Sequence, residues 1–259
     1  MEFLKSSKRR SVFSELIYIL LNVALAIAIL AVVWAVDSPL AAFALVLLSK
    51  WRVLAVRPRY WFANIQANLV DIIVSLSLVI LLYAASGAVI AQCALTILYI
   101  GWLLFIKPRS KRIFVAIQAG TAVFLGVTAL MTVSYDWLSS VVVIGMWLIG
   151  YSTARHVLLS HEEAHVSLYS LIWGLFIAEI GWLTYHWTFA YELPGVGNIK
   201  LVQSAVIAMS LSFLAERVYS SYVKHGSVRA GDVILPILLS VSLILVLVGF
   251  FNRLGIGTL

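Results

Sequence analysis

The feature that most constrains this chain is a succession of apolar segments, each nearly as long as a bilayer is thick. The hydrocarbon core of a membrane is about 30 Å thick, and a helix needs about 20 apolar residues to cross it. Short polar turns such as Asp37-Ser38-Pro39 separate the segments. The predicted spans are residues 14–36, 39–56, 68–85, 88–106, 113–134, 137–157, 166–189, 199–219 and 232–251.

The composition excludes a soluble globular fold. Hydrophobic residues make up 63% of the 259 residues and charged residues only 11%. A soluble domain of this size has too little interior to bury that much apolar surface. The single cysteine, Cys93, lies in an apolar stretch and supports neither a disulfide framework nor a cysteine-based metal site. We therefore predict an all-α, polytopic membrane helix bundle of about nine transmembrane helices.

The lysines and arginines predict the orientation of the bundle. With the N-terminus in the cytoplasm, sixteen of the 18 fall in predicted inside segments, and only Lys200 and Arg253 fall outside. Such an excess on the cytoplasmic side is what the positive-inside rule requires. We expect a multi-pass protein of the plasma (inner) membrane. The same asymmetry accounts for the net charge of +7 without nucleic acid, which is not an expected partner.

Two stretches of the first half resemble each other. Residues 57–68 read RPRYWFANIQAN and residues 107–120 read KPRSKRIFVAIQAG, so both combine a basic Pro-Arg motif with a later Phe-x-x-Ile-Gln-Ala. This pattern predicts a parallel two-helix repeat over residues 41–85 and 91–134. Because the longest loops have about ten residues, residues 1–259 are expected to form a single transmembrane domain with no soluble domain.

Glu179 lies inside the seventh predicted span, where an ionisable side chain is costly and suggests a function. His186 follows two helical turns later and points the same way. A stripe of small residues on the same helix predicts close packing that shields Glu179 from lipid: Ser170, Gly174, Ala178 and Gly181. Glu179 and His186 are thus predicted to form an intramembrane polar site, either a proton or cation site or a neutral hydrogen-bonded link between helices.

A second polar group is predicted on the cytoplasmic side. Asn64, Asn68 and Asp71 share one helical face, and Trp61 begins it. Such a cluster could bind a phosphate or a lipid head group, or it could simply be an interfacial helix start with Asp71 paired to an arginine. The predicted cluster consists of Arg57, Arg59, Asn64, Asn68, Asp71 and Glu216.

Residues 161–165 match the His-Glu-x-x-His pattern of zinc hydrolases. On a helix, His161 and His165 would bind one metal ion while Glu162 activates its water. A third ligand is not evident, because Glu179 lies fourteen residues beyond His165 and nothing in 160–173 predicts a reversal of the chain. A capping box formed by Ser160 and Glu163 explains most of the same residues without zinc.

The sequence leaves three functions open. The first is a small transporter or carrier that uses Glu179 and His186 within the bundle. The second is a non-enzymatic membrane scaffold or assembly partner, and the third is a zinc-dependent membrane hydrolase. The first is favoured, so an enzyme is not the expectation and no cofactor is predicted unless the zinc motif binds its metal. The expected partners are the lipid bilayer and a membrane protein or a second copy of the chain.

Overall fold

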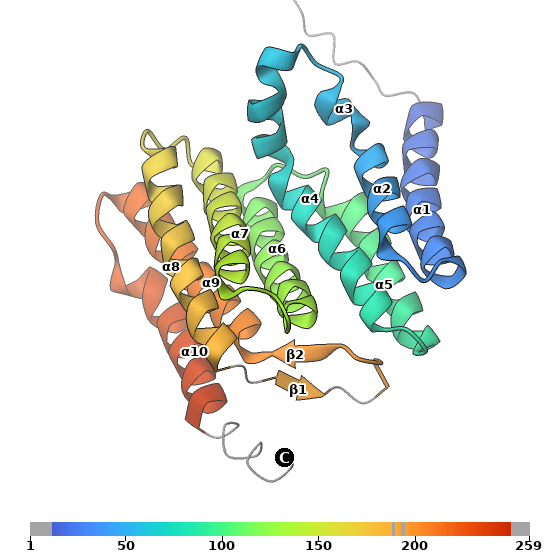
Figure 1. Cartoon of the computed structure of the whole chain (residues 1–259). Helices are drawn as coiled ribbons and strands as arrows, with labels where there is room; N and C mark the ends of the chain where they lie inside the picture. The colour runs from blue at the N-terminus through green and yellow to red at the C-terminus, as the bar shows by residue number, and fades with distance from the viewer. Residues whose placement is uncertain (1–11, 188–189, 193–194, 250–259) are drawn as a thin grey trace, which may run out of the picture.

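A computed structural model describes residues 12–187, 190–192 and 195–249 (Figure 1). The helices of the first half are α1 (Val12–Ala35), α2 (Pro39–Ser49), α3 (Trp51–Leu54), η1 (Pro58–Tyr60), α4 (Trp61–Ala84), α5 (Val89–Gly101) and the π-helical segment η2 (Trp102–Ile106). They are followed by α6 (Arg112–Val133), α7 (Ser139–Ser160), α8 (Val166–His186), β1 (Ala190–Glu192), β2 (Lys200–Val202), α9 (Gln203–His225) and α10 (Ala230–Gly249).

Local sequence explains where several helices begin and end. The hydroxyl of Ser38 accepts a hydrogen bond from the Leu40 amide, and Pro39 occupies the first turn of α2, where no amide donor is needed. Lys50 departs from helical geometry (φ −96°, ψ 11°) and separates α2 from α3. Gly226 ends α9 in the left-handed conformation (φ 69°) that glycine adopts without steric cost.

The helical surface is apolar almost everywhere. Side chains such as Leu40, Ile90 and Leu235 are more than 70% exposed, which in a soluble protein would form large unfavourable patches. Within the described residues, seven helices are long and apolar enough to cross a membrane, so the chain has the build of a multi-pass membrane protein. The other two predicted spans correspond to α2, which has 11 residues, and to α9, which carries several charges in its second half.

The helices pack in two groups that meet at α4 and α6 (Figure 1). One buried cluster joins α1, α2, α4 and α5 around Ile29, Val46 and Leu82. The other joins α6, α7, α8 and α9 around Val123, Met146 and Ile177. The two predicted repeat units share a layout, since each pairs a helix that leaves α-geometry near its end with a long following helix. The duplication itself stays a prediction.

The closest helix contact joins α7 and α8, and it is made by the predicted small residues. Ser170, Gly174, Ala178 and Gly181 are buried, which confirms the prediction of close packing at this stripe. A Cβ atom on Gly181 would lie 2.5 Å from Cγ of Met146, and one on Gly150 would lie 2.7 Å from Cβ of Ile177. The two helices therefore approach each other more closely than any larger side chain allows.

A short hairpin links the two groups at the end of the bundle opposite the start of α1 (Figure 1). β1 pairs with β2 in antiparallel register, and the loop between them reaches the α4–α5 turn, where the Asn198 amide donates to the carbonyl of Ala84. Gly197 has a φ of 69°, and a Cβ atom there would lie 3.0 Å from both the Ala84 oxygen and Cα of Ala85. Only glycine fits this contact.

We expect Gly197→Ala to destabilise the fold by about 2–3 kcal/mol, because the left-handed backbone costs about 1–2 kcal/mol for alanine and the new methyl group also strikes Ala84 and Ala85. Gly195→Ala is the matched control, since Gly195 has a φ of 79° but open space around its Cβ position. Unfolding in mixed detergent micelles measures both variants. Equal losses would show that the hairpin contact contributes nothing.

Candidate functional site

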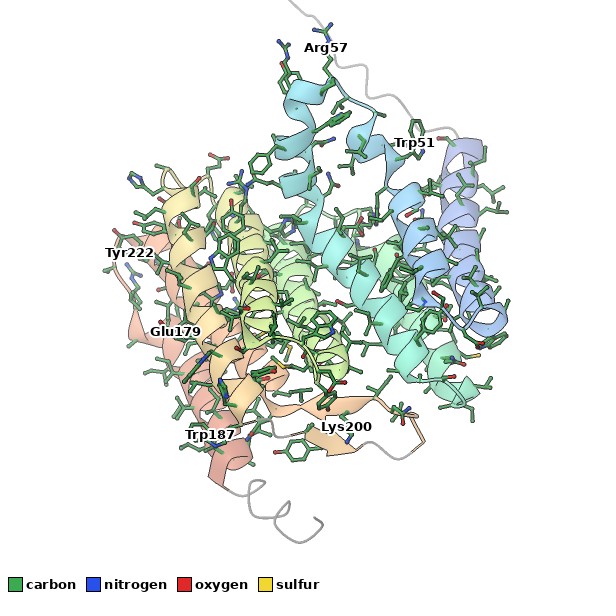
Figure 2. The ribbon with its side chains drawn as sticks, in the orientation of Figure 1. Trp51, Arg57, Glu179, Trp187, Lys200 and Tyr222 are labelled. Carbon is green, nitrogen blue, oxygen red and sulfur yellow. The ribbon has the colours of Figure 1, made fainter. Side chains whose placement is uncertain are left out.

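The predicted site in α8 is not inside the bundle. Glu179 and His186 are both exposed, and Figure 2 shows Glu179 on the outer side of the molecule. His186 packs between the rings of Trp182 and Tyr185. Glu179 forms no hydrogen bond or ion pair with any residue that the structure describes. The prediction of an intrabundle Glu179–His186 site is therefore wrong, because the buried small-residue stripe faces α7 and turns Glu179 outward.

The His-Glu-x-x-His residues do not lie on a helix either. α7 ends at Ser160 and α8 begins at Val166, so residues 161–165 form the turn that reverses the chain. Glu162 has a φ of 58°, and His165 is exposed. The helical geometry assumed for a zinc site is absent, and so is the predicted capping box. Among the described residues, no three His, Cys, Asp or Glu side chains come together as metal ligands.

Glu163 holds this turn instead. Its carboxylate accepts a hydrogen bond from the His165 amide (3.0 Å) and another from the hydroxyl of Tyr219 on α9. These bonds, that of Tyr219 first, lower the pKa of Glu163. His161 is buried edge-on against the Tyr219 ring. Burial, with a smaller effect of the Arg112 charge, lowers the pKa of His161.

Acid is expected to loosen this turn in two steps. The folded protein keeps His161 neutral, whereas the unfolded chain protonates it below the ordinary histidine pKa of about 6.5. The free energy of unfolding therefore falls as the pH drops through that value. Glu163 stabilises the fold above the ordinary glutamate pKa of about 4.3, and its contribution is lost as the pH falls below that value.

Unfolding temperatures measured between pH 8 and pH 3.5 detect both steps, because this range includes the ordinary pKa values of histidine and glutamate. Tyr219→Phe keeps the ring against His161 and should reduce the lower step alone, because the His165 amide still donates to Glu163. His161→Gln should reduce the upper step, whereas the exposed His165→Gln is the control and should change neither step. An upper step of unchanged size in His161→Gln would show that another group accounts for it.

The residues of the predicted cytoplasmic-side cluster do not come together: those near Asp71 lie around α4, whereas Glu216 lies on α9. Asp71 pairs with Lys50 and with Lys107, whose Nζ lies 2.9 Å from Oδ2, and not with an arginine. Arg57 and Arg59 are exposed, and Arg57 lies at the tip of this end of the molecule (Figure 2). The prediction that they join Asp71 is wrong. Oδ1 of Asp71 is buried and accepts no hydrogen bond from the described residues.

The polar amides near Asp71 have structural partners. Asn64 donates to the carbonyl of Val53 and Asn68 to that of Asn64, so both stabilise the start of α4. The glutamine shared by the two predicted repeat units reaches α7 in both cases. Gln66 donates to the Tyr151 hydroxyl (3.0 Å), and Gln118 lies 2.7 Å from Nε2 of His156. These contacts tie each repeat unit to the second half of the bundle.

Glu216, the last predicted member, lines a pocket in the second half. The pocket has a volume of about 660 Å³ and lies between α6, α7, α8, α9 and α10. This is within the range of about 300–1,000 Å³ that is usual for small-molecule sites. Its wall is almost entirely apolar, with Trp173, Phe213 and Leu243 among the larger side chains. Gly120 faces open space, because a Cβ atom there would have no neighbour within 4 Å.

Few polar groups enter this apolar space, and two of them are unsatisfied. Oε2 of Glu216 and Oγ of Ser212 are buried and make no hydrogen bond to a described residue. Nε of Arg217 lies 3.4 Å from the Glu216 oxygen, but this side chain is 40% exposed and its guanidinium group packs on Phe213. Met209, Ser212, Phe213 and Glu216 follow one another at helical spacing, so α9 presents them to the pocket together.

The sequence did not predict this pocket, since its walls come from five helices. One feature of the sequence pointed to it: α9 is more polar than every other long helix among the described residues, and it is the one not apolar enough to count as a membrane span. Comparison with protein families, curated proteins and solved structures finds no match to this chain. The function is therefore argued from the geometry of the pocket.

Proposed function

We propose that this chain is a membrane-embedded carrier for amphiphilic molecules, which bind in the pocket between α6 and α10 with their polar head at Glu216. One observation carries the proposal: a pocket of about 660 Å³ with a largely apolar wall, in which Oε2 of Glu216 and Oγ of Ser212 are buried and make no hydrogen bond to a described residue. Buried polar groups normally have partners, and each exception calls for an explanation. A ligand head group supplies the missing partner.

The chemistry of the pocket selects the ligand class. The long apolar wall fits a hydrocarbon chain or ring system, whose burial is favourable in proportion to its area. Glu216 accepts hydrogen bonds, and a carboxylate binds a charged donor more strongly than a neutral one. The preferred ligand is therefore a lipophilic amine. An acid of the same chain length binds more weakly, because its carboxylate meets that of Glu216 and must compete with Glu216 for Arg217, which also lines the pocket.

The edge of the pocket supports loading from the bilayer. Ile113, Phe213 and Leu239 line the pocket and are exposed on the outer helical surface. That surface faces lipid in a membrane bundle, so an amphiphile can enter sideways without crossing water. Transport through Glu179 and His186 is no longer part of the proposal, since neither residue lines this pocket.

The proposal includes nine membrane passes with a cytoplasmic N-terminus in the plasma membrane. Arg57 and Lys200 lie at opposite ends of the bundle, as the charge asymmetry requires (Figure 2). The passes formed by α2 with α3 and by α9 are shorter or more polar than the others; α2 packs against α1 and α4, and α9 packs against α6 and α10. The N-terminal cations and Arg253 fall outside the described residues.

Binding of a fluorescent dodecylamine to the protein in nanodiscs tests the proposal. Glu216→Gln should weaken amine binding about tenfold, the effect expected for one charge-assisted hydrogen bond. Gly120→Phe should weaken it at least as much, because the new ring enters the pocket from a position where a Cβ atom has no neighbour within 4 Å. Dodecanoate should bind the wild-type protein more weakly than the amine does.

Glu179→Gln is the matched control, since it makes the same chemical change outside the pocket and should leave amine affinity unchanged. Unfolding temperatures of all variants check that each one folds. Amine binding that is the same in Glu216→Gln and in Gly120→Phe as in the wild-type protein would overturn the proposal. Equal binding of amine and acid would overturn the role of Glu216.

A further inference from the structure

Glu179 remains without a partner on a surface that faces lipid. It lies within α8, thirteen residues after the helix begins and seven before it ends. In a bilayer no water reaches such a position to hydrogen-bond a carboxyl group. Ionisable side chains inside spans therefore pair with another group or line a cavity. The carboxyl group forms no hydrogen bond or ion pair with a described residue, and a partner from a second molecule would satisfy it.

The outer face of α8 has the pattern of a helix–helix seam. Exposed residues recur along it at alternating steps of four and three, which is the spacing of the a and d positions of a heptad. Trp182 and Leu175 flank Glu179 on this face, and α7 covers the opposite face. The seam consists of Leu168, Ile172, Leu175, Glu179, Trp182 and His186.

A second copy of the same helix can supply a hydrogen-bond partner for the Glu179 carboxyl group. In a parallel helix pair, equivalent seam positions lie opposite each other, so Glu179 would meet Glu179 of the second copy. A protonated carboxyl group both donates and accepts a hydrogen bond. Two carboxyl groups that hold at least one proton between them therefore complement each other without a cation. A polar residue at a single a position is also the usual device that sets the register of such a pair.

We infer that the chain forms a parallel homodimer through the outer face of α8, with the two Glu179 side chains in contact at its centre. The apolar seam residues on either side provide the packing, and the carboxyl pair sets the register. The pocket beside Glu216 lies on another face of α8, where Tyr169 and Trp173 contribute to its wall, so both pockets stay open in the dimer.

Cysteine cross-linking of the purified protein in liposomes tests this interface. In a Cys93→Ser background, Leu175→Cys and Trp182→Cys should form disulfide-linked dimers. Ile90→Cys on α5 and Leu235→Cys on α10 are the controls, since both positions are exposed on other lipid-facing surfaces. Adding Glu179→Leu should reduce cross-linking at position 175 about fivefold, the effect of one hydrogen bond within a membrane. Glu179→Gln keeps a donor and an acceptor and should preserve it.

Single-molecule photobleaching of the chain in liposomes gives an independent count of copies. Two bleaching steps per particle, reduced to one by Glu179→Leu, are expected. Cross-linking at position 175 no stronger than at position 235, or a single step for the wild-type chain, would overturn the inference. Cross-links at 175 and 182 that Glu179→Leu leaves unchanged would overturn the role of the carboxyl pair. Amine binding is measured separately, so failure here leaves the proposed carrier function standing.

Discussion

Asp71→Asn is expected to destabilise the protein by about 3–5 kcal/mol, the cost of breaking a buried ion pair by removing one partner. The carboxylate compensates two ammonium groups, and Lys50 is only 9% exposed. Without it, two like charges face each other where α2, α4 and the end of η2 meet. Lys107 is 34% exposed and can turn toward solvent, but Lys50 cannot. Unfolding in mixed detergent micelles measures the loss.

The cause of this loss can be separated from a general effect of the substitution. Lys50→Met in the Asp71→Asn background removes the stranded charge and should restore most of the lost stability. Asp136→Asn, at an exposed position in the α6–α7 turn, is the control and should change stability by no more than about 0.5 kcal/mol. A double variant as unstable as Asp71→Asn would show that charge compensation is not what Asp71 contributes.

Gly181→Leu is expected to cost about 3 kcal/mol, because its side chain must occupy space that Met146 already fills. The first carbon atom alone would lie 2.5 Å from Cγ of Met146. The two helices must separate along their whole contact, since a Cβ atom on Gly150 would lie 2.7 Å from Ile177 and one on Gly174 would lie 3.0 Å from Trp147. Resistance to unfolding should fall, and proteolysis at the 161–165 turn should rise.

Two further variants test this steric explanation. Gly101→Leu places the same side chain where no atom lies within 4 Å, and it should be tolerated. Met146→Ala opens a cavity by itself, but combined with Gly181→Leu it relieves the clash, so the double variant should lose less stability than the sum of the two single losses. Strict additivity would contradict the explanation.

The periodicity of the sequence predicted the helices and the small-residue stripe of α8 correctly, but it did not predict the position of Glu179. Helix periodicity shows which residues share a face, and the stripe of Ser170, Gly174, Ala178 and Gly181 was correctly placed against another helix. The same pattern contained the signal that Glu179 faces away. It follows Ala178 by one residue, which is a rotation of about 100° around the helix. The error lay in assuming that a polar residue in a span must point inward.

The remaining contacts depend on which helices become neighbours, and one sequence does not show this. Asp71 was expected to pair with Arg57 or Arg59 because they precede it in the chain, yet its partners come from Lys50 and Lys107. The predicted spans 137–157 and 166–189 placed a turn near residues 161–165, but the pattern did not show what stabilises it. Glu163 stabilises it through Tyr219, which lies 56 residues away in the chain.

Photolabelling in liposomes shows where an amphiphile binds on this protein. A long-chain amine that carries a diazirine is activated in the bilayer, and the labelled peptides are identified by mass spectrometry. We expect label to concentrate on the pocket walls of α6, α9 and α10, near Gly120, Phe213 and Leu243, and Glu216→Gln to disperse it. Label spread evenly over the lipid-facing helices, with α1 and α5 labelled as strongly as α9, would contradict an amphiphile-binding pocket.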